Sequence, residues 1–346
     1  MTKPEYALAL AGGGTRGAFE VGVWQALNEL GIDISAIVGT SIGAVNGAVF
    51  VSGTDPTDIW KQIRAKDVID IKGDNLFSLS TLASTVRQIV DGGVDASAFD
   101  KLLEKHIDED KIRNSPIEYG LCTYRTDIKK SETLFVDQIP YGELVDYILA
   151  SANFPVFKRK TIDGVNYIDG GVTNNLPIDM LIERGYDTII SVSVKGVGFS
   201  KSADKCGINI INIEPRNPEV GIMEFDNDAI AKSIKSGYYE CMRVFGKYKG
   251  DIYSITHDSY EEAHFIYGGD ILKGIEEAAE MCGIDKYMVY TFDALKEKVL
   301  SEYKNSKKLS FLVSTMESEN PARSILDSLG KLFRAANAVV YLKKHD

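Results

Sequence analysis

The sequence has few cysteines and no excess of positive charge, and each shortage excludes a class of protein. Its four cysteines among 346 residues form no C-x-x-C pair, which argues against a disulfide framework or a zinc site and predicts reduced, buried thiols. Lysine and arginine total 39 against 50 acidic residues, a net charge of −11, which argues against a nucleic-acid partner. We predict no metal and no cofactor.

Long apolar segments are also missing. Residues 34–54 carry no charge and would be long enough to span a membrane. However, Gly39, Ser41, Gly43 and Asn46 in this stretch favour a strand, a turn and a helix. No apolar segment precedes the Ala-Leu-Ala of residues 7–9, so no signal peptide is predicted. We expect a cytoplasmic protein and leave peripheral membrane contact open.

Apolar runs and helical periodicity alternate near the N-terminus, which is typical of a parallel α/β sheet. The pattern predicts strands at residues 6–11 and 34–38 and helices at 18–30 and 44–51. Further strands are predicted at residues 119–124, 133–136, 188–194 and 208–213, with a strand ending near Asp169, and further helices at 144–150 and 230–245.

The character of the chain changes near residue 250. Residues 251–320 have a net charge of −7, whereas residues 321–346 have a net charge of +3. We therefore predict one domain over residues 6–250 and a mainly helical extension over residues 251–346, with helices at 271–281 and 292–303.

An apolar helical face with flanking cations is predicted after Pro321. Its apolar members are Ile325, Leu329, Leu332, Phe333, Ala336 and Val340. Such a helix either lies at a lipid surface or packs on the domain, and packing is the favoured interpretation. A rival for lipid docking is a lid within residues 55–110, which carries Leu76, Phe77, Leu79 and Leu82.

A glycine-rich turn joins the first predicted strand to the first helix. Its G-x-G-x-x-G pattern is formed by Gly12, Gly13, Gly14, Thr15, Arg16 and Gly17. A dinucleotide site would need an acidic residue at the end of the second strand, and none is present there. Backbone N–H groups of such a turn can instead hold an oxyanion. A tight turn without a ligand is the structural alternative.

A serine lies on the next strand-to-helix turn, in the pattern G-x-S-x-G. Gly39 and Gly43 flank Ser41, as in a nucleophile elbow, and the N–H of Ile42 would then be a second oxyanion donor. A serine nucleophile needs a base. His106, His257, His264 and His345 are the four histidines, and none lies in a glycine-flanked loop at a strand end.

Asp169 is the alternative base, because it ends a predicted strand and is followed by Gly170 and Gly171. Burial in a dry pocket would raise its pKa and make it a better proton acceptor. Asp-Gly also occurs in ordinary turns, so a purely structural role is the other interpretation.

These blocks together resemble the patatin-like phospholipases, in particular bacterial members of that family. Residues 12–17, 39–43 and 169–171 match in order, and residues 150–157 and 172–177 agree more loosely. The resemblance covers residues 6–180 and implies a three-layer α/β/α fold with a mainly parallel sheet. It implies a Ser41–Asp169 dyad without histidine or metal, an oxyanion hole at residues 12–14, and Arg16 beside that hole.

The resemblance implies a serine lipid acyl hydrolase that acts on phospholipid, lysophospholipid or another acyl ester in lipid breakdown. An acyltransferase or thioesterase on the same scaffold is an alternative. Two further alternatives are a nucleotide-binding module that uses residues 12–17 and a catalytically silent scaffold. The intact Ser41 and Asp169 motifs argue against the silent scaffold.

Overall fold

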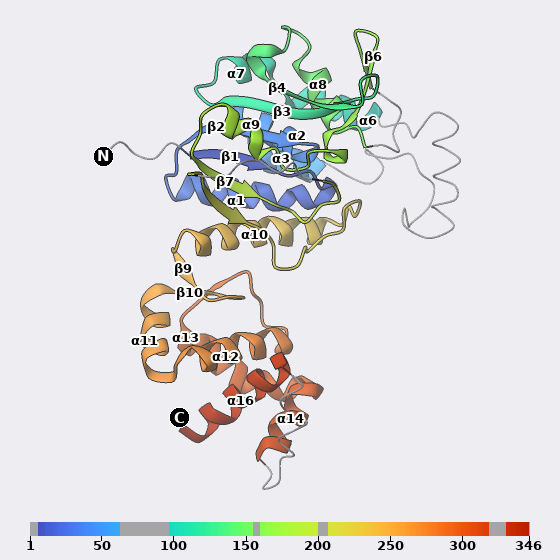
Figure 1. The fold of residues 1–346 in the computed structure, drawn as a ribbon. Helices are drawn as coiled ribbons and strands as arrows, with labels where there is room; N and C mark the ends of the chain where they lie inside the picture. Colours follow the sequence, from blue (N-terminus) through green and yellow to red (C-terminus); the bar gives the residue numbers. More distant parts are fainter. Residues whose placement is uncertain (1–5, 63–96, 155–159, 200–206, 318–329, 346) are drawn as a thin grey trace, which may run out of the picture. The chain divides into compact units, whose positions relative to one another are not determined.

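The computed structural model describes residues 6–62, 97–154, 160–199, 207–317 and 330–345 (Figure 1). The chain divides into two compact units, Met1–Cys241 and Met242–Asp346. The sequence placed the change near residue 250. The lid considered for residues 76–82 lies outside the described residues, as does Cys206.

An eight-stranded sheet forms the centre of the first unit. Five strands run parallel in the order β3 (Glu118–Arg125), β2 (Ile34–Thr40), β1 (Tyr6–Leu10), β7 (Thr188–Val192) and β8 (Asn209–Ile213). Strands β4 (Lys130–Phe135) and β6 (Val165–Asp169) pair antiparallel with β3, and β5 (Lys160–Ile162) pairs antiparallel with β6. The strand predictions in this unit are therefore confirmed to within a few residues.

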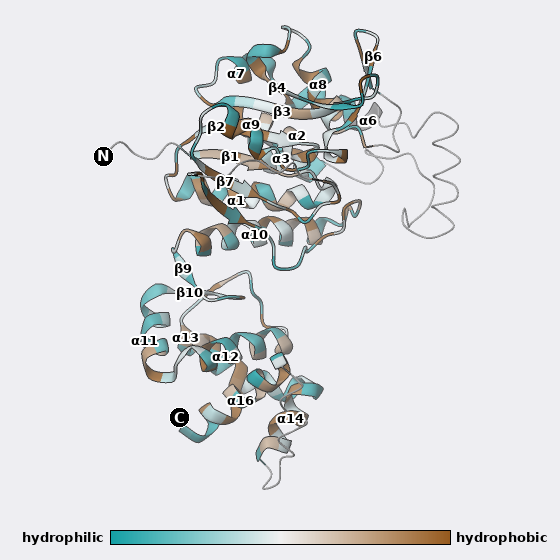
Figure 2. Cartoon of the chain, viewed as in Figure 1, coloured by the Kyte–Doolittle hydropathy of each residue, from teal (hydrophilic) through white to brown (hydrophobic). Residues whose placement is uncertain are grey.

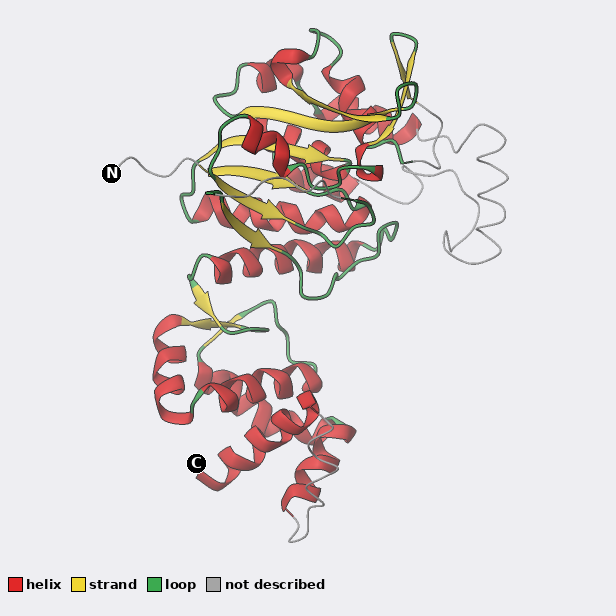
Figure 3. Cartoon of the chain, viewed as in Figure 1, coloured by secondary structure: helices red, strands yellow, loops and turns green. Residues whose placement is uncertain are grey.

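Helices cover both faces of this sheet, so the predicted mixed α/β fold with a mainly parallel sheet is confirmed (Figure 3). Helix α9 (Ile178–Glu183) packs on the face that carries Ala7, Ala9 and Val38. Helix α2 (Ile42–Val51) packs on the other face, where Gly47 lies close to the side chain of Ile37. Because both faces are buried, β1 is apolar at every position after Tyr6, and β2 is apolar at Ile34 and from Ala36 to Val38 (Figure 2).

The remaining elements of this unit frame the sheet. Helix α10 (Asn227–Val244) packs on α1 (Ala18–Glu29), where Gly22 and Gly237 allow the two backbones to approach closely. The shorter elements are η1 (Gly14–Gly17), α3 (Pro56–Gln62), α6 (Ser97–His106), α7 (Glu109–Arg113), η2 (Val136–Gln138), α8 (Leu144–Ser151) and η3 (Gly170–Val172).

The second unit is largely helical, with its own apolar core. It contains α11 (His257–Tyr267), α12 (Gly269–Cys282), α13 (Phe292–Glu302), η4 (Tyr303–Asn305), α14 (Lys307–Glu317) and α16 (Gly330–His345). A small sheet of β9 (Tyr248–Lys249), β10 (Ser254–Thr256) and β11 (Val289–Tyr290) was not predicted. Such strands of two or three residues are too short to show a period in the sequence.

The last helix packs into this core. Its buried residues are Ala335, Ala336, Ala338, Val339, Val340 and Leu342. Gly274 of α12 lies against Arg334 and Ala338, and Arg334 pairs with the buried Glu277 at 2.6 Å. The packed interpretation is therefore confirmed for residues 330–345, and the lipid-facing one is wrong there. Ile325 and Leu329 lie outside the described residues.

Two further features bear on the class of protein. Within the described residues, no helix combines the length and apolar character needed to cross a bilayer. Cys122 and Cys241 are buried free thiols, and Cys282 is a half-buried free thiol.

Candidate active site

The turn between β2 and α2 has the geometry of a nucleophile elbow. Ser41 has φ 56° and ψ −127°, a conformation that costs a residue with a side chain about 1–3 kcal/mol. Both neighbouring glycines are required by space, because a Cβ on Gly39 would lie 2.3 Å from the carbonyl carbon of Gly43. The turn thus holds the Ser41 side chain above the start of α2.

Ser151 fixes this strained turn, and sequence reasoning did not single it out. Its hydroxyl accepts a hydrogen bond from the N–H of Ser41 at 2.9 Å and donates to the carbonyl of Cys122 at 2.7 Å. Ser151 ends α8, and Cys122 lies on β3 beside β2. One buried hydroxyl therefore ties the elbow to the neighbouring strand.

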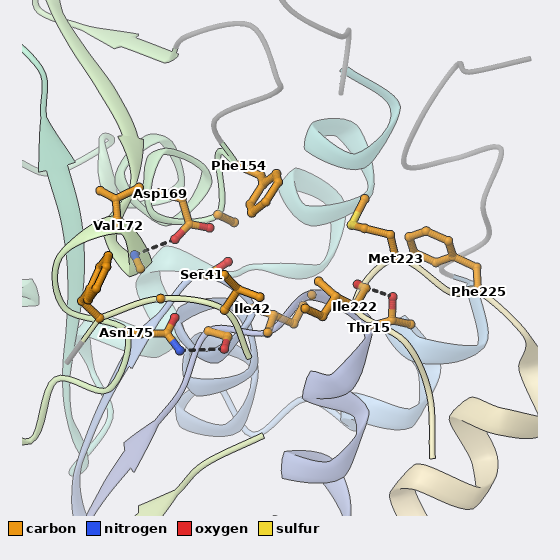
Figure 4. Close-up of a pocket in the computed structure, with 18 of the residues that line it drawn as sticks. Thr15, Ser41, Ile42, Phe154, Asp169, Val172, Asn175, Ile222, Met223 and Phe225 are labelled. Atoms are coloured by element: carbon orange, nitrogen blue, oxygen red, sulfur yellow. Dashed lines mark hydrogen bonds between the residues drawn. The ribbon is translucent and has the colours of Figure 1, made fainter. Parts of the chain in front are cut away.

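Asp169 lies at the end of β6 and faces Ser41 (Figure 4). Its carboxylate accepts a hydrogen bond from the N–H of Gly171 at 2.7 Å. Burial raises the pKa of Asp169 to about 6, because the loss of solvation outweighs the interactions with the Ser41 side chain and the Gly171 N–H that favour the charged form. The two predicted catalytic side chains thus face one another in the same cavity (Figure 4).

The glycine-rich turn lies beside this pair, although not all of its N–H groups face inward. Gly12 and Asn175 are joined by two hydrogen bonds of 3.0 Å: the Gly12 N–H donates to the Asn175 carbonyl, and the Asn175 amide donates to the Gly12 carbonyl. The Gly12 N–H is therefore occupied. The N–H groups of Gly13, Gly14 and Ile42 make no hydrogen bond within the described residues.

Arg16 does not reach the cavity. Its guanidinium donates to the carbonyl of Val220 at 3.2 Å and to the carbonyl of Lys195. The side chain therefore braces the glycine-rich turn against two other loops. Arg16 is part of the glycine-rich turn, as expected, but its side chain points to these two carbonyls and does not line the cavity.

A cavity of about 520 Å³ opens over Ser41 and Asp169. Its lining is mostly apolar and comes from seven separate segments of the first unit. The side chains that form its walls belong to Ile42, Trp60, Phe154, Val172, Val197, Phe199, Ile222, Met223 and Phe225. Asp169 is the one ionisable side chain that the described residues contribute to this lining.

The four histidines lie elsewhere. His257, His264 and His345 are exposed, His106 is half-buried at the end of α6, and none of them lines the cavity. The described part of the chain also holds no group of three or more His, Cys, Asp or Glu side chains placed to bind a metal ion.

A second buried network lies behind the glycine-rich turn and was not predicted. The Asn46 amide donates to Glu20 at 2.8 Å and to the carbonyl of Gly17 at 2.9 Å, and it accepts from the Trp60 indole at 3.0 Å. Burial raises the pKa of Glu20 well above its usual range. This network links α1, α2 and the Trp60 wall of the cavity.

The patatin-like phospholipase family model matches residues 8–182 of the chain. The chain belongs to this family, and the resemblance inferred from its motifs is confirmed. The match contains the glycine-rich turn, Ser41 and Asp169.

Sequence relatives carry the same family name. The chain is 30% identical over 197 residues to patatin-like phospholipase domain-containing protein 7 of Rattus norvegicus. It is 30% identical over 201 residues to patatin-like phospholipase domain-containing protein 6 of Homo sapiens. Each match covers 56% of this chain and 14% of the relative. An uncharacterized NTE family protein of Mycobacterium tuberculosis is 30% identical over 203 residues, which are 56% of this chain and 50% of the relative. The matched part thus spans half or less of these relatives.

Similar solved structures include VipD from Legionella pneumophila, with 13% identity and a TM-score of 0.42 over 97% of this chain and 90% of that chain. ExoU of Pseudomonas aeruginosa in complex with SpcU has 14% identity and a TM-score of 0.37 over 97% of this chain and 76% of that chain.

Proposed function

We propose that this protein is a serine hydrolase of lipid acyl esters that uses Ser41 as nucleophile and Asp169 as base. One observation carries the proposal: the Ser41 side chain, on a strained elbow, faces the buried carboxylate of Asp169 in an apolar cavity (Figure 4). Family membership supports the lipid class of substrate. All the residues of the proposal lie in the first unit, to which we assign catalysis.

The reaction follows from the geometry. Asp169 accepts the proton of Ser41 as Oγ attacks the ester carbonyl, and the carbonyl π electrons move onto oxygen. We assign the stabilisation of this oxyanion to the N–H groups of Gly13, Gly14 and Ile42, because these residues line the cavity and their N–H groups make no hydrogen bond within the described residues. When the tetrahedral intermediate collapses, Asp169 returns the proton to the leaving alcohol and an acyl-Ser41 ester remains.

Water then completes the cycle. Asp169 takes a proton from the attacking water, the oxyanion forms again, and collapse releases a fatty acid and returns the proton to Ser41. If an alcohol or thiol replaced water in this step, the same site would act as a transferase. The apolar cavity suits an acyl chain, and its described lining residues include no cationic side chain that would hold a nucleotide phosphate.

The proposal is tested by incubating the purified protein with a mixed phospholipid extract and identifying the products by mass spectrometry. We expect free fatty acid and lysophospholipid, and no products from the Ser41→Ala variant. Acyl groups found mainly on a second lipid would favour the transferase. Unchanged lipids, with folded protein, would contradict the proposal.

A further inference from the structure

A short loop after β7 alternates glycine with exposed apolar residues. Gly196 lies against Gly12 and Gly13, and Gly198 lies against Gly171 and Asn175. A Cβ on Gly196 would lie 2.1 Å from the Gly12 carbonyl oxygen. The glycines therefore face the catalytic loops. Val197 follows Gly196, and Phe199 follows Gly198. These two residues are 75% and 76% exposed, and we call them the apolar rim.

The main chain holds this arrangement. The N–H of Phe199 donates to the carbonyl of Gly171 at 3.1 Å, and the N–H of Asn175 donates to the carbonyl of Phe199 at 2.6 Å. Phe199 is thus paired on both sides of its peptide with the loop that follows Asp169. The aromatic ring is exposed on a fixed backbone, and contiguous exposed apolar patches mark surfaces that another molecule covers.

The rim lies at the mouth of the catalytic cavity. Val197 and Phe199 line the cavity together with Ser41 and Asp169. Met223 and Phe225, which are half-buried, lie on the other side of Ser41 from Asn175 (Figure 4). Apolar side chains therefore border the opening on two sides, and an acyl chain that enters between them passes from one apolar surface to another.

We propose that the apolar rim inserts into the surface of a zwitterionic phospholipid bilayer and so delivers the acyl ester to Ser41. This inference rests on the proposed function. Charge favours a zwitterionic surface: Lys195 is exposed beside the rim, Glu224 and Asp226 are exposed beside Met223 and Phe225, and the chain carries −11 overall. An anionic surface would be repelled from this side of the opening.

Insertion is tested with catalytically silent Ser41→Ala protein and phosphatidylcholine vesicles. Phe199→Trp places a reporter on the rim. The matched control is Tyr141→Trp, because Tyr141 is 74% exposed in the same unit. Tyr141 also follows β4, whose last residue pairs with the start of β3, whereas Asp169 pairs with the other end of β3. Trp24 and Trp60 give the same background in both variants.

We expect vesicles to shift the emission of the Phe199→Trp variant to the blue and brominated phosphatidylcholine to quench it, with neither change beyond the background for Tyr141→Trp. In sedimentation assays, Phe199→Ser and Val197→Ser should each lower vesicle partitioning by about tenfold, whereas Tyr141→Ser should not. Circular dichroism confirms that each variant is folded, and Val197→Ser serves if a substitution at Phe199 is not tolerated.

Three results would overturn the inference: no sedimentation with phosphatidylcholine vesicles, binding to anionic vesicles alone, or binding without quenching at position 199. The last result would indicate another docking surface, on a protein partner or elsewhere on this chain. Hydrolysis of a soluble short-chain ester by the unmodified protein tests the proposed function separately. If the protein hydrolyses the ester but does not bind vesicles, the rim inference fails alone. If it binds vesicles through the rim but does not hydrolyse the ester, the proposed function fails.

Discussion

At the scale of single residues, the ionisation of Asp169 controls the proposed chemistry. Only the carboxylate can accept the Ser41 proton, and burial raises the pKa of Asp169 to about 6. We therefore predict that kcat for a soluble ester falls as the pH drops through about 6 and is level above about 7. An acid limb near pH 4, the range of an unperturbed aspartate, would contradict the raised pKa of Asp169.

Ser151 should matter because it holds the strained elbow. Ser151→Ala would leave the N–H of Ser41 and the carbonyl of Cys122 without their present partner, which costs about 1–3 kcal/mol. We predict a fall in kcat of about tenfold with little change in KM. Ser52→Ala, at the other end of α2, is the matched control. Equal kcat in both variants would refute the positioning role.

At the scale of elements, the strand-turn-helix that carries Ser41 leaves no room for an added methyl group. A Cβ on Gly39 would overlap the backbone of Gly43, so Gly39→Ala must displace the elbow or the start of α2. We predict at least a tenfold loss of kcat and a lower melting temperature. Gly31→Ala is the comparison, because Gly31 has a positive φ and open space around it. It should cost about 1 kcal/mol and leave kcat unchanged. Similar kcat losses in both variants would contradict this account.

The elements that position the site could be predicted because local signals agree there. Strand β1 and strand β2 are continuous apolar runs that end in glycine-rich turns, and both are buried on two faces. Asp169 could be proposed as the base from its place at a strand end, but only the family resemblance paired it with Ser41 as a dyad, since strand order depends on long-range pairing. Ser151 lies in the loosely matching block of residues 150–157, but nothing there indicated its role, and the Asn46 network had no signal, because a single buried polar residue has no period.

Arg16 shows the opposite limit. Its place in the motif indicated a role at the oxyanion hole, yet its guanidinium is directed to backbone carbonyls of other loops. Motifs define where the backbone turns, whereas the direction of a long side chain depends on which acceptors the rest of the fold brings near it.

At the scale of the whole molecule, the second unit depends on its last helix. Truncation after Asn320 removes α16, and with it Ala335, Val339 and Leu342, which have no exposed surface. Each buried aliphatic side chain contributes about 1–3 kcal/mol, and a domain is stable by only about 5–15 kcal/mol. We predict that residues 242–320 become sensitive to limited proteolysis. If they stay protected, the apolar face of α16 is not part of the core.

The central claim is that Ser41, activated by Asp169, is the nucleophile. It is tested most directly by treating the protein with a long-chain alkyl fluorophosphonate and measuring intact and peptide masses over time. We predict one adduct per chain, located on Ser41, no adduct on the Ser41→Ala variant, and labelling slowed by at least about a hundredfold in Asp169→Asn. An adduct on another residue, or equally fast labelling of the Asp169→Asn variant, would contradict the account.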